Sequence, residues 1–103
     1  MSIRPALLRI LGKSYSVSYR KGGPLGDDEQ GDCNYQKQEI TVMDGLGGDE
    51  ERATLLHEAI HCVAYAMGIN LPEKHVEALE GGLYALMVDN PDLMNYLLRR
   101  QDA

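Results

Sequence analysis

The sequence predicts a small α+β fold, in which an antiparallel sheet packs on one long helix and two further helices follow. Before the glycine-rich turn at residues 44–48, apolar and polar residues alternate with the two-residue period of half-buried strands. After that turn the chain shows helical periodicity, punctuated by residues that start and stop helices. The length of 103 residues fits one domain spanning residues 1–103.

Three strands are expected in the N-terminal part. Residues 7–10 and 15–19 flank a Gly12-Lys13 turn, and in the second of these ranges tyrosine and valine alternate with serine. Residues 21–30 are rich in Gly, Pro and Asp, which indicates a loop. A third strand follows at about residues 38–43.

Three helices are expected in the C-terminal part. The first begins with Asp49 as its N-cap and ends at Gly68, a residue typical of helix C-termini. A tight connection leads to the second helix, which has Pro72 near its first position. Asn90 can cap a short third helix that ends near residue 100.

Composition excludes several classes of function. The net charge is −6 and the pI is near 4.9, which disfavours a nucleic-acid-binding protein because phosphate contacts need clustered Lys and Arg. The longest apolar run is too short to span a bilayer, and residues 1–5 do not resemble a signal peptide, so a cytoplasmic protein with no membrane partner is expected. Cys33, in a loop, and Cys62, in the core, are therefore expected to be free thiols.

One motif predicts chemistry. His57-Glu58-Ala59-Ile60-His61 is an H-E-x-x-H sequence within the first predicted helix. Residues four apart lie one above the other on a helix, so both imidazoles can bind one Zn²⁺ ion. Glu58 lies beside them and can accept a proton from zinc-bound water without being a ligand itself. The motif predicts His57 and His61 as zinc ligands and Glu58 as the general base.

A catalytic zinc site usually has a third protein ligand. On the second predicted helix, Glu73, Glu77 and Glu80 share one face, and a helical hairpin would turn this face toward the histidines. We expect Glu73 to lie too near the turn to reach them, which leaves Glu77 and Glu80. Hairpin geometry slightly prefers Glu80. His75 points elsewhere on the helix and is expected at the surface or its boundary, and it ranks behind Glu77 and Glu80 as a candidate ligand.

Three stretches resemble the small phage and prophage zincins, which are similar to the peptidase domain of the ImmA/IrrE group. They are GDCNYQKQEITV at residues 31–42, TLLHEAIH at residues 54–61, and the segment from VEAL through GLY to DNP at residues 76–91. In that group the third ligand is an acidic residue on the helix after the motif, followed at helical spacing by small and apolar residues. The resemblance therefore implies Glu77 as the third ligand, with Glu80 as the alternative.

The resemblance implies a zinc-dependent metallopeptidase that hydrolyses a peptide bond in a protein or peptide substrate, in the host cytoplasm if the protein is phage-encoded. In zincins the substrate adds as a further strand to the edge strand beside the metal. Here we expect that edge strand at residues 38–43. Tyr65 and Tyr84 lie on suitable faces to stabilise the reacting carbonyl, although either can simply belong to the core or its boundary.

A binding module with a structural zinc, for example a phage protein that blocks a host factor, is the alternative function. The same ligands would then stabilise the fold, and no peptide would be cut. The presence of Glu58 between the histidines favours catalysis, because a structural zinc site does not need this carboxylate. The sequence leaves the oligomeric state open.

Overall fold

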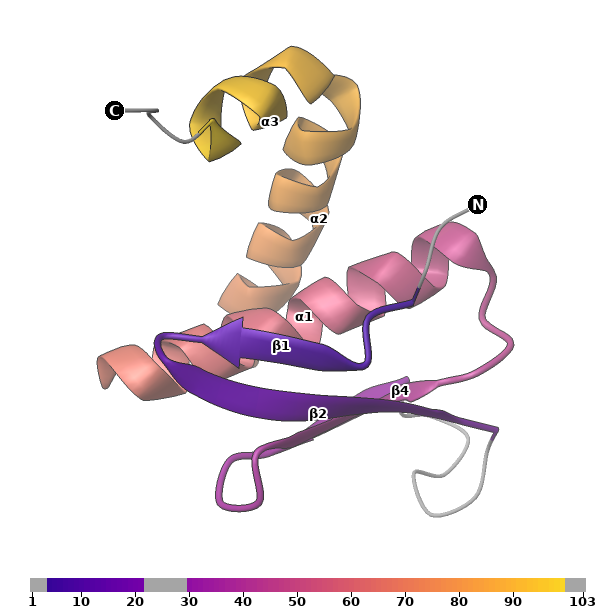
Figure 1. Ribbon diagram of the computed structural model, residues 1–103, viewed down its shortest axis with the longest axis vertical. Coiled ribbons are helices and arrows are strands. Elements are labelled where there is room, and N and C mark those ends of the chain that lie inside the picture. The colour runs from indigo at the N-terminus through magenta and orange to yellow at the C-terminus, as the bar shows by residue number, and fades with distance from the viewer. Residues whose placement is uncertain (1–3, 22–29, 100–103) are drawn as a thin grey trace.

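The computed structural model describes residues 4–21 and 30–99. The elements in chain order are β1 (Leu7–Ile10), β2 (Lys13–Arg20), β3 (Gly31–Asn34), β4 (Glu39–Met43), α1 (Gly48–Met67), α2 (Glu73–Asp89) and α3 (Pro91–Leu98). The small α+β fold is confirmed as one sheet followed by helices (Figure 1). Most of the loop expected at residues 21–30 lies outside the described residues.

The sheet is mixed, so the prediction of an antiparallel sheet was wrong. Its strand order is β1-β2-β4-β3, with antiparallel pairs at both ends and a parallel pair, β2 and β4, in the middle. The cause is the additional strand β3, which runs along the outer edge before the turn at residues 35–38 sends β4 back beside β2. Residues 31–34 contain no β-branched or aromatic residue, and this is why the sequence pattern did not reveal the strand.

The same topology changes which strand lies at the edge. β4 is hydrogen-bonded on both sides, so the expectation of an edge strand at residues 38–43 was wrong. Ile40 and Val42 on β4 are fully buried, as befits a central strand. Of the strands that the structure describes, β3 forms the edge on this side of the sheet.

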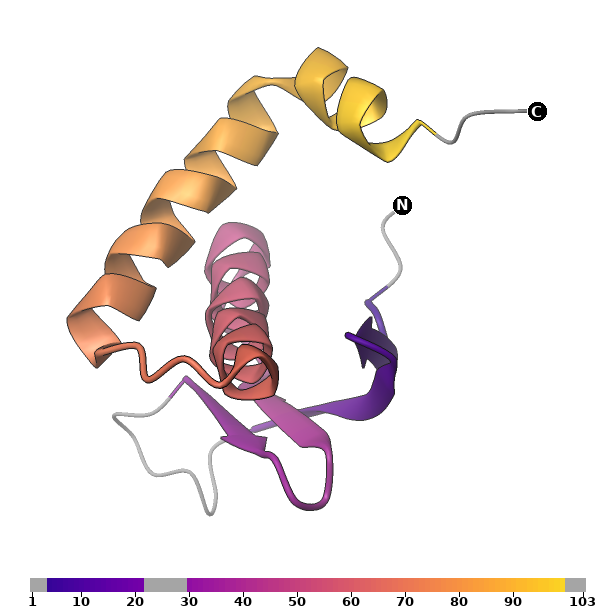
Figure 2. The same ribbon diagram turned by 90° about the vertical axis from the view of Figure 1, so that its left-hand side faces the viewer.

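The core lies between the sheet and α1. It is formed by the buried residues Ile10, Tyr15, Val17, Ile40, Val42 and Cys62. Cys62 is contributed by α1, so the motif helix is fixed directly on the sheet. α2 rises beside α1, and α3 lies beyond the far end of α2, away from the sheet (Figure 2).

The helix boundaries follow the sequence closely, but two caps differ from expectation. Gly68 ends α1 in the left-handed conformation, as predicted. The N-cap of α1 is Gly47, and Asp49 lies in the first turn instead. Asn90 occupies the N-cap position of α3, as predicted, but its side chain makes no capping hydrogen bond and instead donates back to the Leu86 carbonyl at 2.9 Å. No helix among the described residues combines the length and apolar character that crossing a membrane requires.

Candidate metal centre

His57 and His61 lie one turn apart on α1 and present their Nε2 atoms to a single carboxylate. Glu73, the first residue of α2, contacts His57 Nε2 at 3.1 Å through one oxygen and His61 Nε2 at 2.8 Å through the other. Ligand atoms of these three residues all lie within 4.8 Å of one another. Ligand atoms around a tetrahedral zinc ion are about 3–4 Å apart, so small side-chain movements would allow this group to bind a metal ion.

The expectation that Glu73 could not reach the histidines was wrong. It assumed that α1 and α2 are joined by a tight turn. Residues 69–72 are instead non-helical, and residues 69–71 line a small cavity together with His61 and Ala64. Four residues can span up to about 13 Å, the length of about two helical turns. The chain therefore returns along α1 to the level of the motif before α2 begins.

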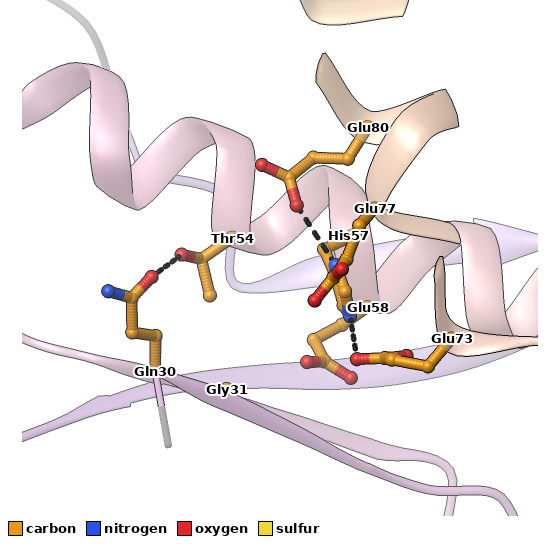
Figure 3. A pocket seen from close by; sticks show the side chains of 8 residues that line it. All are labelled: Gln30, Gly31, Thr54, His57, Glu58, Glu73, Glu77 and Glu80. Carbon is orange, nitrogen blue, oxygen red and sulfur yellow. Dashed lines mark hydrogen bonds and ion pairs between the residues drawn. The ribbon is translucent and has the colours of Figure 1, made fainter. Parts of the chain in front are cut away.

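Glu80 contacts the other nitrogen of His57. Its Oε1 lies 2.9 Å from His57 Nδ1 (Figure 3). A carboxylate on Nδ1 fixes the orientation and tautomer of an imidazole and leaves Nε2 for a metal ion. In this arrangement Glu80 orients His57. Glu77 lies between Glu73 and Glu80 on the same side of α2 and lines the same cavity, and its role as third ligand stays a prediction.

The electrostatics of His57 follow from these contacts. Burial opposes the charge on the ring, but the hydrogen bond that His57 donates to Glu80 and the negative charges of Glu58 and Glu73 outweigh burial and raise the pKa of His57. With a carboxylate at each nitrogen, both ring N–H groups can donate when the ring is protonated. Without a metal ion, the site thus stabilises the imidazolium form of His57.

We expect nuclear magnetic resonance titration of the metal-free protein to give His57 a pKa above the ordinary value of about 6.5. Because folding raises the pKa of His57, protonation of its ring stabilises the folded state. This stabilisation is fully present at a pH below the pKa of the unfolded state, and it is lost as the pH rises through the pKa of the folded state. Glu80→Gln should lower the pKa of His57. An unchanged value in this variant would contradict the role given to Glu80.

Glu58 lies between the metal group and the sheet. Only 7% of its surface is exposed, and it borders a cavity of about 370 Å³ that opens beside α2 (Figure 3). The cavity is lined by Gln30, Gly31, Thr54, His57, Glu58, Glu73, Glu77 and Glu80. A buried carboxylate next to two imidazoles, facing a space that a substrate can enter, has the position of a general base.

Gly31 on β3 makes this close packing possible. A Cβ atom at this position would lie 2.9 Å from both Glu58 Oε2 and Thr54 Cγ2, and 3.1 Å from Glu58 Cγ. The end of a Glu side chain can move, but the Thr54 methyl group can retreat only if α1 shifts or if the side chain rotates away from the contact between its hydroxyl and Gln30. The absence of a side chain at Gly31 therefore lets the edge strand approach α1 beside Glu58, a close contact that the sequence did not predict.

We expect Gly31→Ala to destabilise the fold by about 1–3 kcal/mol, the usual cost of overpacking a tight contact. Thermal unfolding would measure it. Gly82→Ala is the matched control, because a Cβ atom at Gly82 on α2 meets nothing within 4 Å. That control should gain about 0.5–1 kcal/mol, since alanine is favoured over glycine inside a helix. Equal stability of Gly31→Ala and the parent would contradict the close approach.

The two tyrosines that the sequence offered as carbonyl stabilisers lie in different places. The Tyr84 hydroxyl donates to Asp49 at 2.9 Å, about 12 Å along α1 from His57, so Tyr84 does not lie at the metal group. Tyr65 stacks on Tyr35, with ring centroids 4.1 Å apart. Tyr35 itself lines a cavity with both histidines and Glu58. Its pKa is raised to about 12, first by burial and then by the neighbouring thiols of Cys33 and Cys62, so its hydroxyl stays protonated at neutral pH.

The residues brought together are thus the motif residues from α1, three glutamates from α2, and Gly31 and Tyr35 from the β3 region. Of these, Glu73, Gly31 and Tyr35 were not singled out as site residues from the sequence.

Comparison of the chain with protein-family models, with curated proteins and with solved structures finds no match.

Proposed function

We propose that this chain is a zinc-dependent peptidase, in which His57, His61 and Glu73 bind the ion and Glu58 is the general base. The observation that carries the proposal is the convergence of both histidine Nε2 atoms on one carboxylate, directly beside a buried Glu58. Two imidazoles and one carboxylate form a donor set that catalytic zinc takes, with a fourth position left for water. The residues present therefore fit the ion.

Each side chain has a distinct role in this proposal. A zinc ion at the site would polarise the substrate carbonyl and make water a better nucleophile at neutral pH. Glu58 accepts the proton of the attacking water and can pass it to the leaving amine. Glu80 holds the His57 ring so that Nε2 faces the ion. Tyr35, protonated and in the neighbouring cavity, is a candidate hydrogen-bond donor to the reacting carbonyl oxygen.

The edge strand supports a peptide as the substrate. Among the strands that the structure describes, β3 has β4 as its one neighbour, and it borders the cavity that contains Glu58 and both histidines. An extended peptide can add to such an edge through main-chain hydrogen bonds. This would lay its backbone across the cavity, with a peptide bond next to Glu58.

The proposal is tested with a peptide library derived from a proteome. The zinc-loaded protein should generate new peptide termini, detected by mass spectrometry. Chelation should stop the cleavage and added zinc should restore it. Tight, stoichiometric zinc with no cleavage of any peptide or protein offered would favour the alternative, a binding module with a structural zinc.

We expect Glu73→Gln to weaken zinc affinity by more than about 100-fold, because it removes a ligand, and Glu80→Gln by about 10–100-fold, as for partners that orient a ligand. Glu77→Gln should have the smallest effect of the three. Competition titration with a chromogenic chelator measures all three variants. If Glu77→Gln had the largest effect, the ligand role would pass to Glu77, as the resemblance to the ImmA/IrrE group implies.

A further inference from the structure

The two cysteines meet where the edge strand crosses the motif helix. Cys33 on β3 and Cys62 on α1 are 29 residues apart in sequence, and their Sγ atoms are 2.7 Å apart. Both are free thiols. Cys62 is fully buried, whereas Cys33 is partly exposed and lines the same cavity as His61 and Glu58. One thiol is thus within reach of a solute and the other lies directly behind it.

The surrounding packing keeps these sulfur atoms together. Cys62 belongs to the core, and Cys33 packs against that core from the edge strand. β3 is in turn held by its register with β4, in which Cys33 pairs with Ile40. Both cysteines therefore sit on regular elements of one packed unit. Converting the contact into a bond requires only a small approach of the two sulfur atoms, toward about 2.05 Å.

We propose that Cys33 and Cys62 are a redox pair that closes to a disulfide and crosslinks the edge strand β3 to the motif helix α1. The proposal does not depend on the proposed function. The oxidant is a low-molecular-weight disulfide, such as oxidised glutathione. Because Cys33 is the accessible thiol, its sulfur attacks first and releases one glutathione thiol. Cys62 then attacks the mixed disulfide at Cys33 and releases the second.

The exchange balances. Two protein thiols become one disulfide, the glutathione disulfide takes up the two electrons, and the two protons leave with the two glutathione thiols. The crosslink would join Cys62, which directly follows His61 in α1, to Cys33, which lies two positions after Gly31 in β3. In the oxidised protein the strand that borders the metal cavity could no longer separate from the helix that carries the motif.

The test equilibrates the full chain with glutathione buffers of increasing oxidised fraction, with and without zinc. Mass spectrometry after acid quenching and thiol alkylation should show a form lighter by two hydrogen atoms that resists alkylation, and proteolysis should yield a peptide pair linked through Cys33 and Cys62. The oxidised form should also unfold at a higher temperature, because the crosslink closes a chain loop. Cys62→Ser should instead stop at a mixed disulfide with glutathione on Cys33.

The parent chain alone suffices if Cys62→Ser does not fold. Persistent free thiols in fully oxidised glutathione, or glutathione attached to both cysteines of the parent, would overturn the proposal. Because zinc content and cleavage play no part in this measurement, failure here is distinct from failure of the peptidase proposal.

Discussion

Replacing Glu58 by Gln is expected to reduce peptide cleavage by about 10²–10⁴-fold, the usual contribution of a general base. The substitution keeps the size of the side chain, so the packing against Gly31 and Thr54 should survive. It removes the basic carboxylate that accepts the proton in the proposed mechanism. Zinc content should remain close to that of the parent, because Glu58 is not in the group of ligand atoms.

The measurement compares initial cleavage rates and zinc content of the parent, Glu58→Gln and Glu50→Gln. Glu50 lies exposed in the first turn of the same helix, so Glu50→Gln makes the same chemical change away from the site and should leave both quantities unchanged. Loss of zinc from Glu58→Gln would make Glu58 a ligand or a structural group. Parental cleavage of a verified substrate by Glu58→Gln would refute the hydrolytic mechanism.

The same variant offers a route to the substrate. In the proposed mechanism, the zinc-loaded Glu58→Gln protein binds a peptide along β3 without cutting it. Proteins retained by Glu58→Gln, but released after zinc is chelated, would be candidate substrates. Each would then have to be cut by the parent protein in a purified system.

Local sequence patterns predicted the elements that depend on neighbouring residues. The alternation around Tyr15 and Val17 predicted β2, and Gly68 predicted the end of α1, because side-chain period and capping act within a few residues. The mixed sheet was not predictable in this way. Its parallel pair depends on where β3 lies, and residues 31–34 have side chains that give little sign of a strand.

In the candidate site, too, the residues that depend on local spacing were predicted, and those that depend on the path of the chain were not. His57, Glu58 and His61 share one helix, so their spacing alone brought them together. The choice among the glutamates of α2 depended on the path of residues 69–72, which no periodic pattern specifies. That path places Glu73 against both histidines and Glu80 against the far nitrogen of His57. The sequence predicted that the glutamate face of α2 turns toward the histidines. It did not predict that the first residue of this face, Glu73, lies at the level of both imidazoles.

The double variant His57→Ala, His61→Ala is expected to abolish stoichiometric zinc binding. The parent, purified without chelator, should contain about one zinc ion per chain by elemental analysis. Removing both imidazoles leaves only carboxylates at the site, and these bind zinc weakly when they are exposed to water, as Glu73 and Glu77 are. His75→Ala is the matched control, because His75 lies exposed on α2 outside the metal group and should retain the parental zinc content.

Thermal unfolding gives an independent measure of the same site. A ligand that binds only the folded chain stabilises it by about 4 kcal/mol when its free concentration is 1,000 times the Kd. Added zinc should therefore raise the Tm of the parent and of His75→Ala, and leave the Tm of the double variant unchanged. Loss of the imidazoles also changes the stability of the double variant itself, because Glu73 and Glu80 lose their partners. Measuring the change in Tm on adding zinc to each variant cancels this contribution. If the double variant bound zinc as tightly as the parent, the metal site would lie elsewhere, and the proposed role of Glu58 as general base would be wrong as well.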